Sequence, residues 1–203
     1  MITALLSEDQ RDALQEITNI GIGQAAASIA AILGEFVQLS VPRILILRPE
    51  LIGAALLRII GKEPVTAVRQ GFHGELRGEA LIIYDSQHCR ELASLMGYGE
   101  TLDQATEREL LFDVSNVLVG ACLGGIAEQI KTEIGFSAPS LMADHLPVDK
   151  LLSAAEIHTP CALFVEVNLS LEHRSFASHL VMLMPEEEIL VVRAALDRFL
   201  DSL

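Results

Sequence analysis

Apolar and small residues recur at helical spacing in two long stretches of the chain. The first stretch, Ser7–Leu33, and the second, about Thr106–Ile134, each predict an amphipathic helix that ends before a glycine, Gly34 or Gly135. Ser7 with Gln10 and Thr106 with Glu109 have the spacing of capping boxes. The predicted inner stripes are Leu14, Ile17, Gly21, Ala25, Ser28 and Ile32 in the first helix and Leu111, Val114, Leu118, Cys122 and Gly125 in the second.

The remaining pattern predicts the same order of elements in both halves of the chain. Each long helix is followed by a strand, each half contains a hairpin, and each half closes with a helix. We therefore predict an α/β (α+β) fold: a single pseudo-two-fold domain made of halves at about 1–100 and 101–203, with all strands in one sheet and both long helices on one face. The predicted segments are 41–47, 51–60 (helix), 67–76, 79–84 and 86–96 (helix), then 137–142, 162–171, 175–184 and 186–200 (helix).

A polar pattern occurs twice, 97 residues apart, on the outer faces of the two long helices. Two acidic residues lie four apart, an asparagine follows three residues later, and a proline follows 23 residues after that. Spacings of four and three place the three polar side chains on one helix face. Two equivalent sites are therefore predicted. Their members are Asp12, Glu16, Asn19 and Pro42 in the first copy and Glu109, Asp113, Asn116 and Pro139 in the second.

The acid and the asparagine nearest the centre of each pattern are the candidate functional residues. A carboxylate can pair with a basic group of a partner, and a carboxamide offers a donor and an acceptor. Asparagine is a poor helix former, so its repeated use inside a helix needs a reason. Gly23 and Gly120, four residues after each asparagine, would let another surface approach closely.

The other members of the pattern have structural interpretations. Asp12 and Glu109 are docking candidates, but acidic residues early in a helix also interact favourably with its dipole, and Glu109 could complete a capping box. We favour the structural interpretation for both. Pro42 and Pro139 are expected to open strands and to fix the helix-to-strand connection.

Composition excludes several classes of function. The formal charge is −14, with 14 Lys and Arg against 28 Asp and Glu, which argues against nucleic acid and anionic membranes and favours a protein partner. No apolar run approaches about 18 residues, and the N-terminus lacks the basic region of a signal peptide. The three widely spaced cysteines do not indicate a disulfide framework, so the cytoplasm is expected.

Familiar cofactor and catalytic motifs are missing or misplaced. The segment Gly21–Ala26 matches the dinucleotide fingerprint GxGxxA, but a helical pattern runs through it where the fingerprint needs a preceding strand. The six histidines lack zinc-like spacing, and no CxxC, GxSxG or Walker motif occurs. No metal or cofactor is expected on this chain.

The two long helices resemble the signature helices of the CheC/CheX/FliY family of phosphatases, which act on the phosphorylated chemotaxis response regulator CheY. The resemblance rests on ALQEITNIGIGQAAASIAAILG and LLFDVSNVLVGACLGGIAEQI. The family pattern is Asp or Ser, three residues, Glu, two residues, Asn, 22 residues and Pro. The first copy matches at every position, whereas Glu109 replaces Asp or Ser and Asp113 replaces Glu in the second. Two sites without an added flagellar-switch domain resemble CheC more than FliY or CheX.

The resemblance implies a mechanism in which Asn19 and Asn116 orient water and Glu16 and Asp113 dock the partner. The implied substrate is the aspartyl phosphate of a CheY-like receiver domain in chemotaxis or another two-component pathway. The receiver itself supplies Mg²⁺ and most of the charge stabilisation. Because Asp113 is about 1.5 Å shorter in reach than glutamate, the second site is expected to be weaker.

Two alternatives remain open at this point. One is a non-catalytic module of the same fold that binds a receiver or the receptor deamidase CheD, which the family resemblance implies as a partner. The other, less favoured, is a structural role at the flagellar switch. Loss of phosphate that depends on Asn19 and Asn116 would distinguish the enzyme from both.

Overall fold

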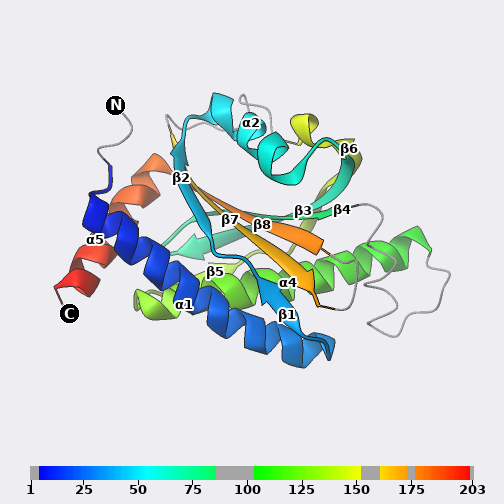
Figure 1. Ribbon diagram of the computed structural model, residues 1–203. Helices are drawn as coiled ribbons and strands as arrows, with labels where there is room; N and C mark the ends of the chain where they lie inside the picture. The colour runs from blue at the N-terminus through cyan, green and yellow to red at the C-terminus, as the bar shows by residue number, and fades with distance from the viewer. Residues whose placement is uncertain (1–4, 86–102, 152–160, 173–176, 202–203) are drawn as a thin grey trace.

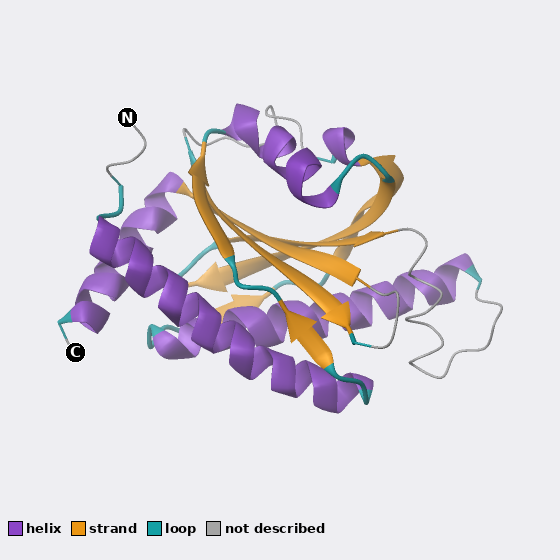
Figure 2. Ribbon diagram, viewed as in Figure 1, coloured by secondary structure: helices purple, strands orange, loops and turns teal. Residues whose placement is uncertain are grey.

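The elements form three layers in the computed structural model, which describes residues 5–85, 103–151, 161–172 and 177–201 (Figure 1). One antiparallel sheet lies between α2 on one face and α1, α4 and α5 on the other (Figure 2). The predicted mixed fold, with both long helices on one face of one sheet, is confirmed. The described helices are α1 (Glu8–Leu33), α2 (Pro49–Ile60), α4 (Gln104–Gln129), α5 (Glu186–Leu200) and the short 3₁₀ helix η2 (Val148–Lys150). The predicted helix at 86–96 lies outside the described residues.

The strands of the two halves are interleaved in the sheet. The order is β1-β7-β8-β4-β3-β5, with β2 also pairing β7 and β6 also pairing β3. The first strands of each half thus pair with the hairpin of the other half, and the two hairpins meet at β4 and β8. Exchange of the halves leaves this pairing pattern unchanged. The strands are β1 (Val37–Leu39), β2 (Arg43–Leu47), β3 (Pro64–Gly74), β4 (Gly78–Asp85), β5 (Ile134–Phe136), β6 (Ser140–Pro147), β7 (Ala162–Leu171) and β8 (Ala177–Pro185).

The ends of α1 are set by local sequence, as predicted. The Ser7 hydroxyl accepts a hydrogen bond from the Gln10 backbone N–H (3.2 Å), and the Gln10 side chain accepts one from the Ser7 N–H (2.8 Å). This reciprocal pair is the expected capping box. At the other end, Gly34 adopts φ 68°, a left-handed conformation that glycine enters without a steric penalty.

The ends of α4 differ from the prediction. Asp103, and not Thr106, caps the helix: its carboxylate accepts a hydrogen bond from the Thr106 N–H (2.7 Å). Hydrogen bonding to Thr106 lowers the pKa of Asp103. The helix ends at Gln129, and Gly135 lies inside β5, where an added Cβ would lie 2.7 Å from the His73 ring. Gly135 therefore lies in a strand beside the His73 side chain and does not terminate the helix.

The inner face of α1 follows the predicted stripe over its first turns and then departs from it. Leu14, Ile17 and Ala25 are buried, but Ser28 is exposed and Ile29 is buried in its place. At 3.6 residues per turn, a step of four from Ala25 stays on the buried face. The first four residues of the α4 stripe, through Cys122, are all buried as predicted.

The two long helices run in opposite directions and touch backbone to backbone at two glycines (Figure 1). A Cβ on Gly21 would lie 2.6 Å from the Gly125 carbonyl carbon, and a Cβ on Gly125 would collide with the Gly21 carbonyl oxygen. Both glycines were placed on inner stripes by the sequence. The GxGxxA segment that begins at Gly21 is therefore part of a continuous helix and serves helix packing.

The two faces of the sheet bury separate sets of side chains. On β7, Leu163 and Val165 pack towards the long helices, whereas Ala162 and Phe164 pack towards α2. This alternation is the pleat of a strand buried on both faces. On β3, Val68 and Phe72 belong to the helix-side core, so Gln70 between them faces α4.

Among the described residues, one helix is long and apolar enough by composition to span a membrane. It is α4, and half of its most apolar window is buried inside the protein. The sequence pattern predicted this helix but did not mark it as one long and apolar enough to span a membrane. Its apolar residues pack against the sheet and α1.

Candidate functional site

The first set of candidate residues lies on the exposed face of α1. Asp12, Glu16, Asn19 and Gly23 are all exposed, while Ile17 on the opposite face is fully buried. Among the described residues, no group hydrogen-bonds the Asn19 carboxamide. The helix therefore presents a carboxylate and a carboxamide to solvent, one turn apart, as the spacing predicted.

The second set lies on the exposed face of α4 but is held differently. Glu109, Asp113 and Asn116 are exposed, and Gly120 is half-buried. The Asn116 Oδ1 accepts a hydrogen bond of 2.8 Å from the Nε2 of Gln70, a residue of β3 that is only 1% exposed. Asn116 thus faces solvent while its carboxamide is tied to the core of the sheet.

The structure brings together the members of each set but keeps the two sets apart. Asn19 lies two residues from the crossing glycine Gly21, whereas Asn116 lies nine residues, about 13 Å of helix, from Gly125. Because α1 and α4 are antiparallel, each set occupies the N-terminal half of its own helix and the two point to opposite ends of the pair. Two separate sites follow from this arrangement.

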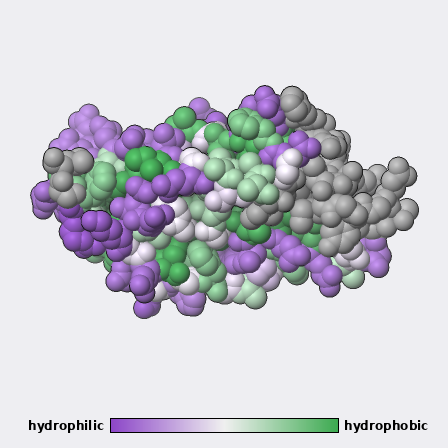
Figure 3. All heavy atoms as spheres, turned by 90° about the horizontal axis from the view of Figure 1, so that it is seen from below, coloured by the Kyte–Doolittle hydropathy of each residue, from purple (hydrophilic) through white to green (hydrophobic). Residues whose placement is uncertain are grey.

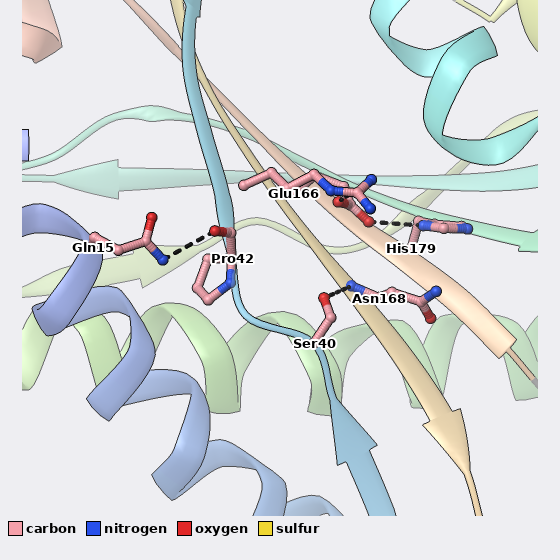
Figure 4. A network of polar contacts seen from close by, with 7 residues as sticks. Gln15, Ser40, Pro42, Glu166, Asn168 and His179 are labelled. Atoms are coloured by element: carbon pink, nitrogen blue, oxygen red, sulfur yellow. Dashed lines mark hydrogen bonds and ion pairs between the residues drawn. The ribbon is translucent and has the colours of Figure 1, made fainter.

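Both prolines of the pattern lie directly before a strand, as predicted. Pro42 precedes β2 and Pro139 precedes β6. The Pro42 carbonyl also accepts a hydrogen bond of 3.0 Å from the Nε2 of Gln15, the residue before Glu16 (Figure 4). The proline therefore helps to fix α1 against the sheet beside the first site and carries no chemistry of its own.

A cavity borders the first site between the start of α1 and β2. It has a volume of about 320 Å³, and its lining combines the side chain of Asp12 with an apolar wall. Asp12 lies beyond the first turn of α1, whose acidic residues are Glu8 and Asp9, so the expected interaction of Asp12 with the helix dipole is weak. Its described lining residues are Leu6, Arg11, Asp12, Gln15, Ile44, Leu45 and Ile46.

The matching cavity beside α4 is smaller and more charged. It has a volume of about 220 Å³, and its lining includes Arg108 and Asp144, whose Nη2 and Oδ2 atoms lie 3.9 Å apart. Because Asp103 caps α4, the predicted capping role of Glu109 is wrong, and Glu109 is simply exposed on the helix surface.

The surface that carries the two long helices is largely hydrophilic. Figure 3 views the molecule from below and shows hydrophilic residues over much of the described surface, with smaller apolar areas between them.

Of the cysteines, Cys122 on α4 is buried, and burial raises its pKa to about 12. Its thiol therefore stays neutral and does not supply a nucleophile.

Gln70 is a residue in direct contact with a candidate site residue that the sequence interpretation missed. A signal for it was present, because a glutamine interrupts the apolar side of a strand that is otherwise buried on that face. Buried polar groups are normally hydrogen-bonded, so such a residue predicts a partner. Only the fold identifies that partner as Asn116, 46 residues further along the chain.

Comparisons with known proteins agree with the sequence resemblance. The family model of the CheC-like family matches residues 10–46, a range that contains the whole first pattern from Asp12 to Pro42. The flagellar motor switch phosphatase FliY of Bacillus subtilis (strain 168) is 24% identical over 161 residues, which cover 72% of this chain and 41% of FliY. The chain thus spans less than half the length of that relative.

Solved structures share the fold at low sequence identity. FliY of Thermotoga maritima matches with a TM-score of 0.71 at 18% identity, over 96% of this chain and 98% of its own. The FliM middle domain of H. pylori matches with a TM-score of 0.63 at 10% identity, over 94% and 99% of the two chains. CheX of Desulfovibrio desulfuricans matches with a TM-score of 0.54 at 13% identity, over 83% and 99%.

The fold is therefore shared with a FliY protein, with a chemotaxis protein CheX and with a middle domain of FliM. The fold alone does not decide between catalysis and binding. The match of the CheC-like model across the first pattern, the sequence similarity to FliY and the shared fold together support the assignment of this chain to the CheC/CheX/FliY family.

Proposed function

We propose that the chain is a phosphatase that hydrolyses the aspartyl phosphate of a response-regulator receiver domain of the CheY type. The observation that carries this proposal is the exposed acid–asparagine pair on each long helix, Glu16 with Asn19 and Asp113 with Asn116. The family model covers the first of these pairs, and FliY is named as a phosphatase. The proposal places the protein in the cytoplasm, together with its substrate.

In the proposed reaction the asparagine positions a water molecule for in-line attack on phosphorus. The water oxygen forms a bond to phosphorus while the bond between phosphorus and the aspartyl oxygen breaks. The products are inorganic phosphate and the free aspartate, and the proton of the water passes to phosphate or solvent. A carboxamide suits this role because it can both accept from and donate to the reacting groups.

The receiver supplies the rest of the chemistry in this scheme. Its Mg²⁺ and its own basic group stabilise the charge on the phosphoryl oxygens, so this chain contributes docking and orientation. Glu16 and Asp113 are the proposed partners of a receiver lysine. Asp12, Gly23, Glu109 and Gly120 lie next to them on the same helices and complete the proposed docking surfaces.

The test is the lifetime of a phosphorylated receiver with and without this protein. The receiver is phosphorylated by a small-molecule phosphodonor, the donor is removed, and the remaining phosphoprotein is followed over time. A catalytic amount of the protein is expected to shorten the lifetime. An unchanged lifetime with every CheY-like receiver that binds the protein would contradict the proposal.

The second candidate function is a binding module without hydrolysis, acting on a receiver or on CheD. One observation favours it: the fold of this chain also matches the FliM middle domain, over 94% of this chain and 99% of that domain. The same experiment separates the two candidates. Stable binding measured by calorimetry, with no change in phosphate lifetime, would establish the module.

Lengthening Asp113 is expected to strengthen the second site. The substitution Asp113→Glu restores the acid found at the same place in the first site and extends its reach by about 1.5 Å, enough to make a direct ion pair with a receiver lysine. In an Asn19→Ala background, where only the second site works, we expect a fall in KM of about threefold to tenfold. Glu16→Asp, measured in an Asn116→Ala background, is the matched control and should raise KM by a similar factor.

A further inference from the structure

The buried amide of Gln70 has an orientation fixed by its surroundings. Its Nε2 lies 2.9 Å from the Ser137 carbonyl oxygen and 2.8 Å from the Asn116 Oδ1. A backbone carbonyl can only accept hydrogen bonds, so the atom of Gln70 that faces Ser137 must be its nitrogen. That nitrogen donates its second hydrogen to Asn116, so the Asn116 atom that faces the sheet must be its oxygen.

This chain of hydrogen bonds determines what Asn116 presents to a partner. With Oδ1 turned towards Gln70, the Nδ2 of Asn116 is on the opposite side of the carboxamide, and the residue is exposed. Oδ1 keeps a second lone pair that can accept from water. The side chain thus offers a donor and one acceptor site in a defined geometry.

The first site lacks this support although the surrounding backbone is equivalent. Ser137 exchanges hydrogen bonds with Gly71: its N–H donates to the Gly71 oxygen, and its hydroxyl accepts from the Gly71 N–H, both at 2.9 Å. Ser40, 97 residues earlier, makes the same pair with Asn168, also at 2.9 Å (Figure 4). Gly71 and Asn168 are therefore equivalent positions in the two halves.

The residue that corresponds to Gln70 is consequently Val167, which precedes Asn168 and is 1% exposed. A valine has no group that can hydrogen-bond Asn19. This agrees with the absence of any hydrogen bond to the Asn19 carboxamide among the described residues. Asn116 thus has a polar partner in the sheet, whereas the equivalent position in the other half of the chain is apolar.

We infer that Gln70 is a positioning residue of the second site, which holds the Asn116 carboxamide in the orientation used for attack on the phosphoryl group. The inference rests on the proposed phosphatase function. A side chain held before the substrate arrives loses less rotational freedom in the transition state, so the effect belongs in kcat. In the first site no described residue hydrogen-bonds Asn19, and the residue equivalent to Gln70, Val167, cannot hold a carboxamide in this way.

Gln70 can be replaced without releasing α4 from the sheet. The buried Tyr84 hydroxyl and Ser115 hydroxyl lie 2.8 Å apart and hydrogen-bond α4 to β4 one residue before Asn116. Gln70→Met keeps the length of the side chain and removes its amide, so it leaves no large cavity. The Gln70 Oε1 has no hydrogen-bond partner among the described residues, so the substitution removes only the two hydrogen bonds that Nε2 donates, to Asn116 Oδ1 and to the Ser137 carbonyl.

The kinetic test compares Gln70→Met in two backgrounds. In Asn19→Ala, where the second site alone works, kcat for receiver dephosphorylation is expected to fall about threefold to tenfold with KM unchanged. In Asn116→Ala, where the first site alone works, the same substitution is expected to change neither parameter. An equal fall in both backgrounds, or none in either, would overturn the inference.

A second measurement on the unmodified protein keeps the inference separate from the phosphatase proposal. The side-chain amide of Asn116 is expected to show higher NMR order parameters than that of Asn19, and Gln70→Met is expected to remove the difference. Equal mobility of the two amides in the unmodified protein would overturn the inference even if the protein proved to be a phosphatase. Restricted Asn116 without any receiver dephosphorylation would instead refute the proposed function alone.

Discussion

Replacing Asn19 and Asn116 together by alanine is expected to lower the acceleration of receiver dephosphorylation by about 10²-fold. Each alanine removes the carboxamide that holds the attacking water, and no other described side chain of either exposed set can both donate and accept hydrogen bonds in its place. Binding of the receiver should change little, because the docking acids Glu16 and Asp113 remain. The measurement is the lifetime of the phosphorylated receiver, with affinity determined in parallel.

The single variants rank the two sites. At low receiver concentration Asn19→Ala should remove most of the activity, because the shorter Asp113 weakens docking at the second site. At saturating receiver the difference in activity between Asn19→Ala and Asn116→Ala should be smaller, since docking no longer limits the rate. If Asn116→Ala removes most of the activity at low receiver concentration, the ranking of the two sites is reversed. Full activity in the double variant would refute a catalytic role for both asparagines.

Replacing Gly125 by alanine is expected to destabilise the protein by about 3 kcal/mol. The new Cβ would collide with the Gly21 carbonyl oxygen and lie 2.9 Å from the Gly21 carbonyl carbon, and these atoms belong to a helix backbone that cannot rotate away. Relief requires α1 and α4 to move apart, which opens the apolar contacts along both helices. Equilibrium unfolding in urea measures the loss.

The neighbouring glycine provides a matched control. Gly124 is in the same turn of α4, but an added Cβ there would meet nothing within 4 Å. Gly124→Ala should therefore raise stability by about 0.5–1 kcal/mol, as alanine replaces glycine inside a helix. If both alanines destabilise equally, the Gly21–Gly125 contact is not what limits the approach of the helices.

Local sequence signals predicted most elements whose boundaries are set by local interactions. The capping box of Ser7 with Gln10, the left-handed Gly34, the strand 162–171 and the helix 186–200 were all found where the pattern placed them. Two kinds of error occurred: the two ends of α4 were misplaced, and short strands that exist through pairing were missed. The three-residue strands β1 and β5 are too short to show a period, and they form because β7 and β3 offer them hydrogen bonds.

For each candidate site, the sequence was enough to predict which residues share one exposed helix face. Spacing alone placed Glu16 with Asn19 and Asp113 with Asn116 on exposed surfaces, and the structure agrees. The different hydrogen bonding of the two asparagines was not predictable in the same way. It depends on the contact of Gln70 with Asn116, and that contact is set by how the sheet docks against the helix.

The interleaved strands have a consequence for the order in which the chain can fold during synthesis. Among the described strands, β1 and β2 pair with β7 alone, more than a hundred residues later, whereas β5 and β6 pair with β3, which has already been made. At cellular rates of translation, the first pair of strands waits on the order of 10 s for its partner. Through that interval the apolar segment of β2 has no native strand to join, so it is a segment of the nascent chain that a chaperone would need to shield.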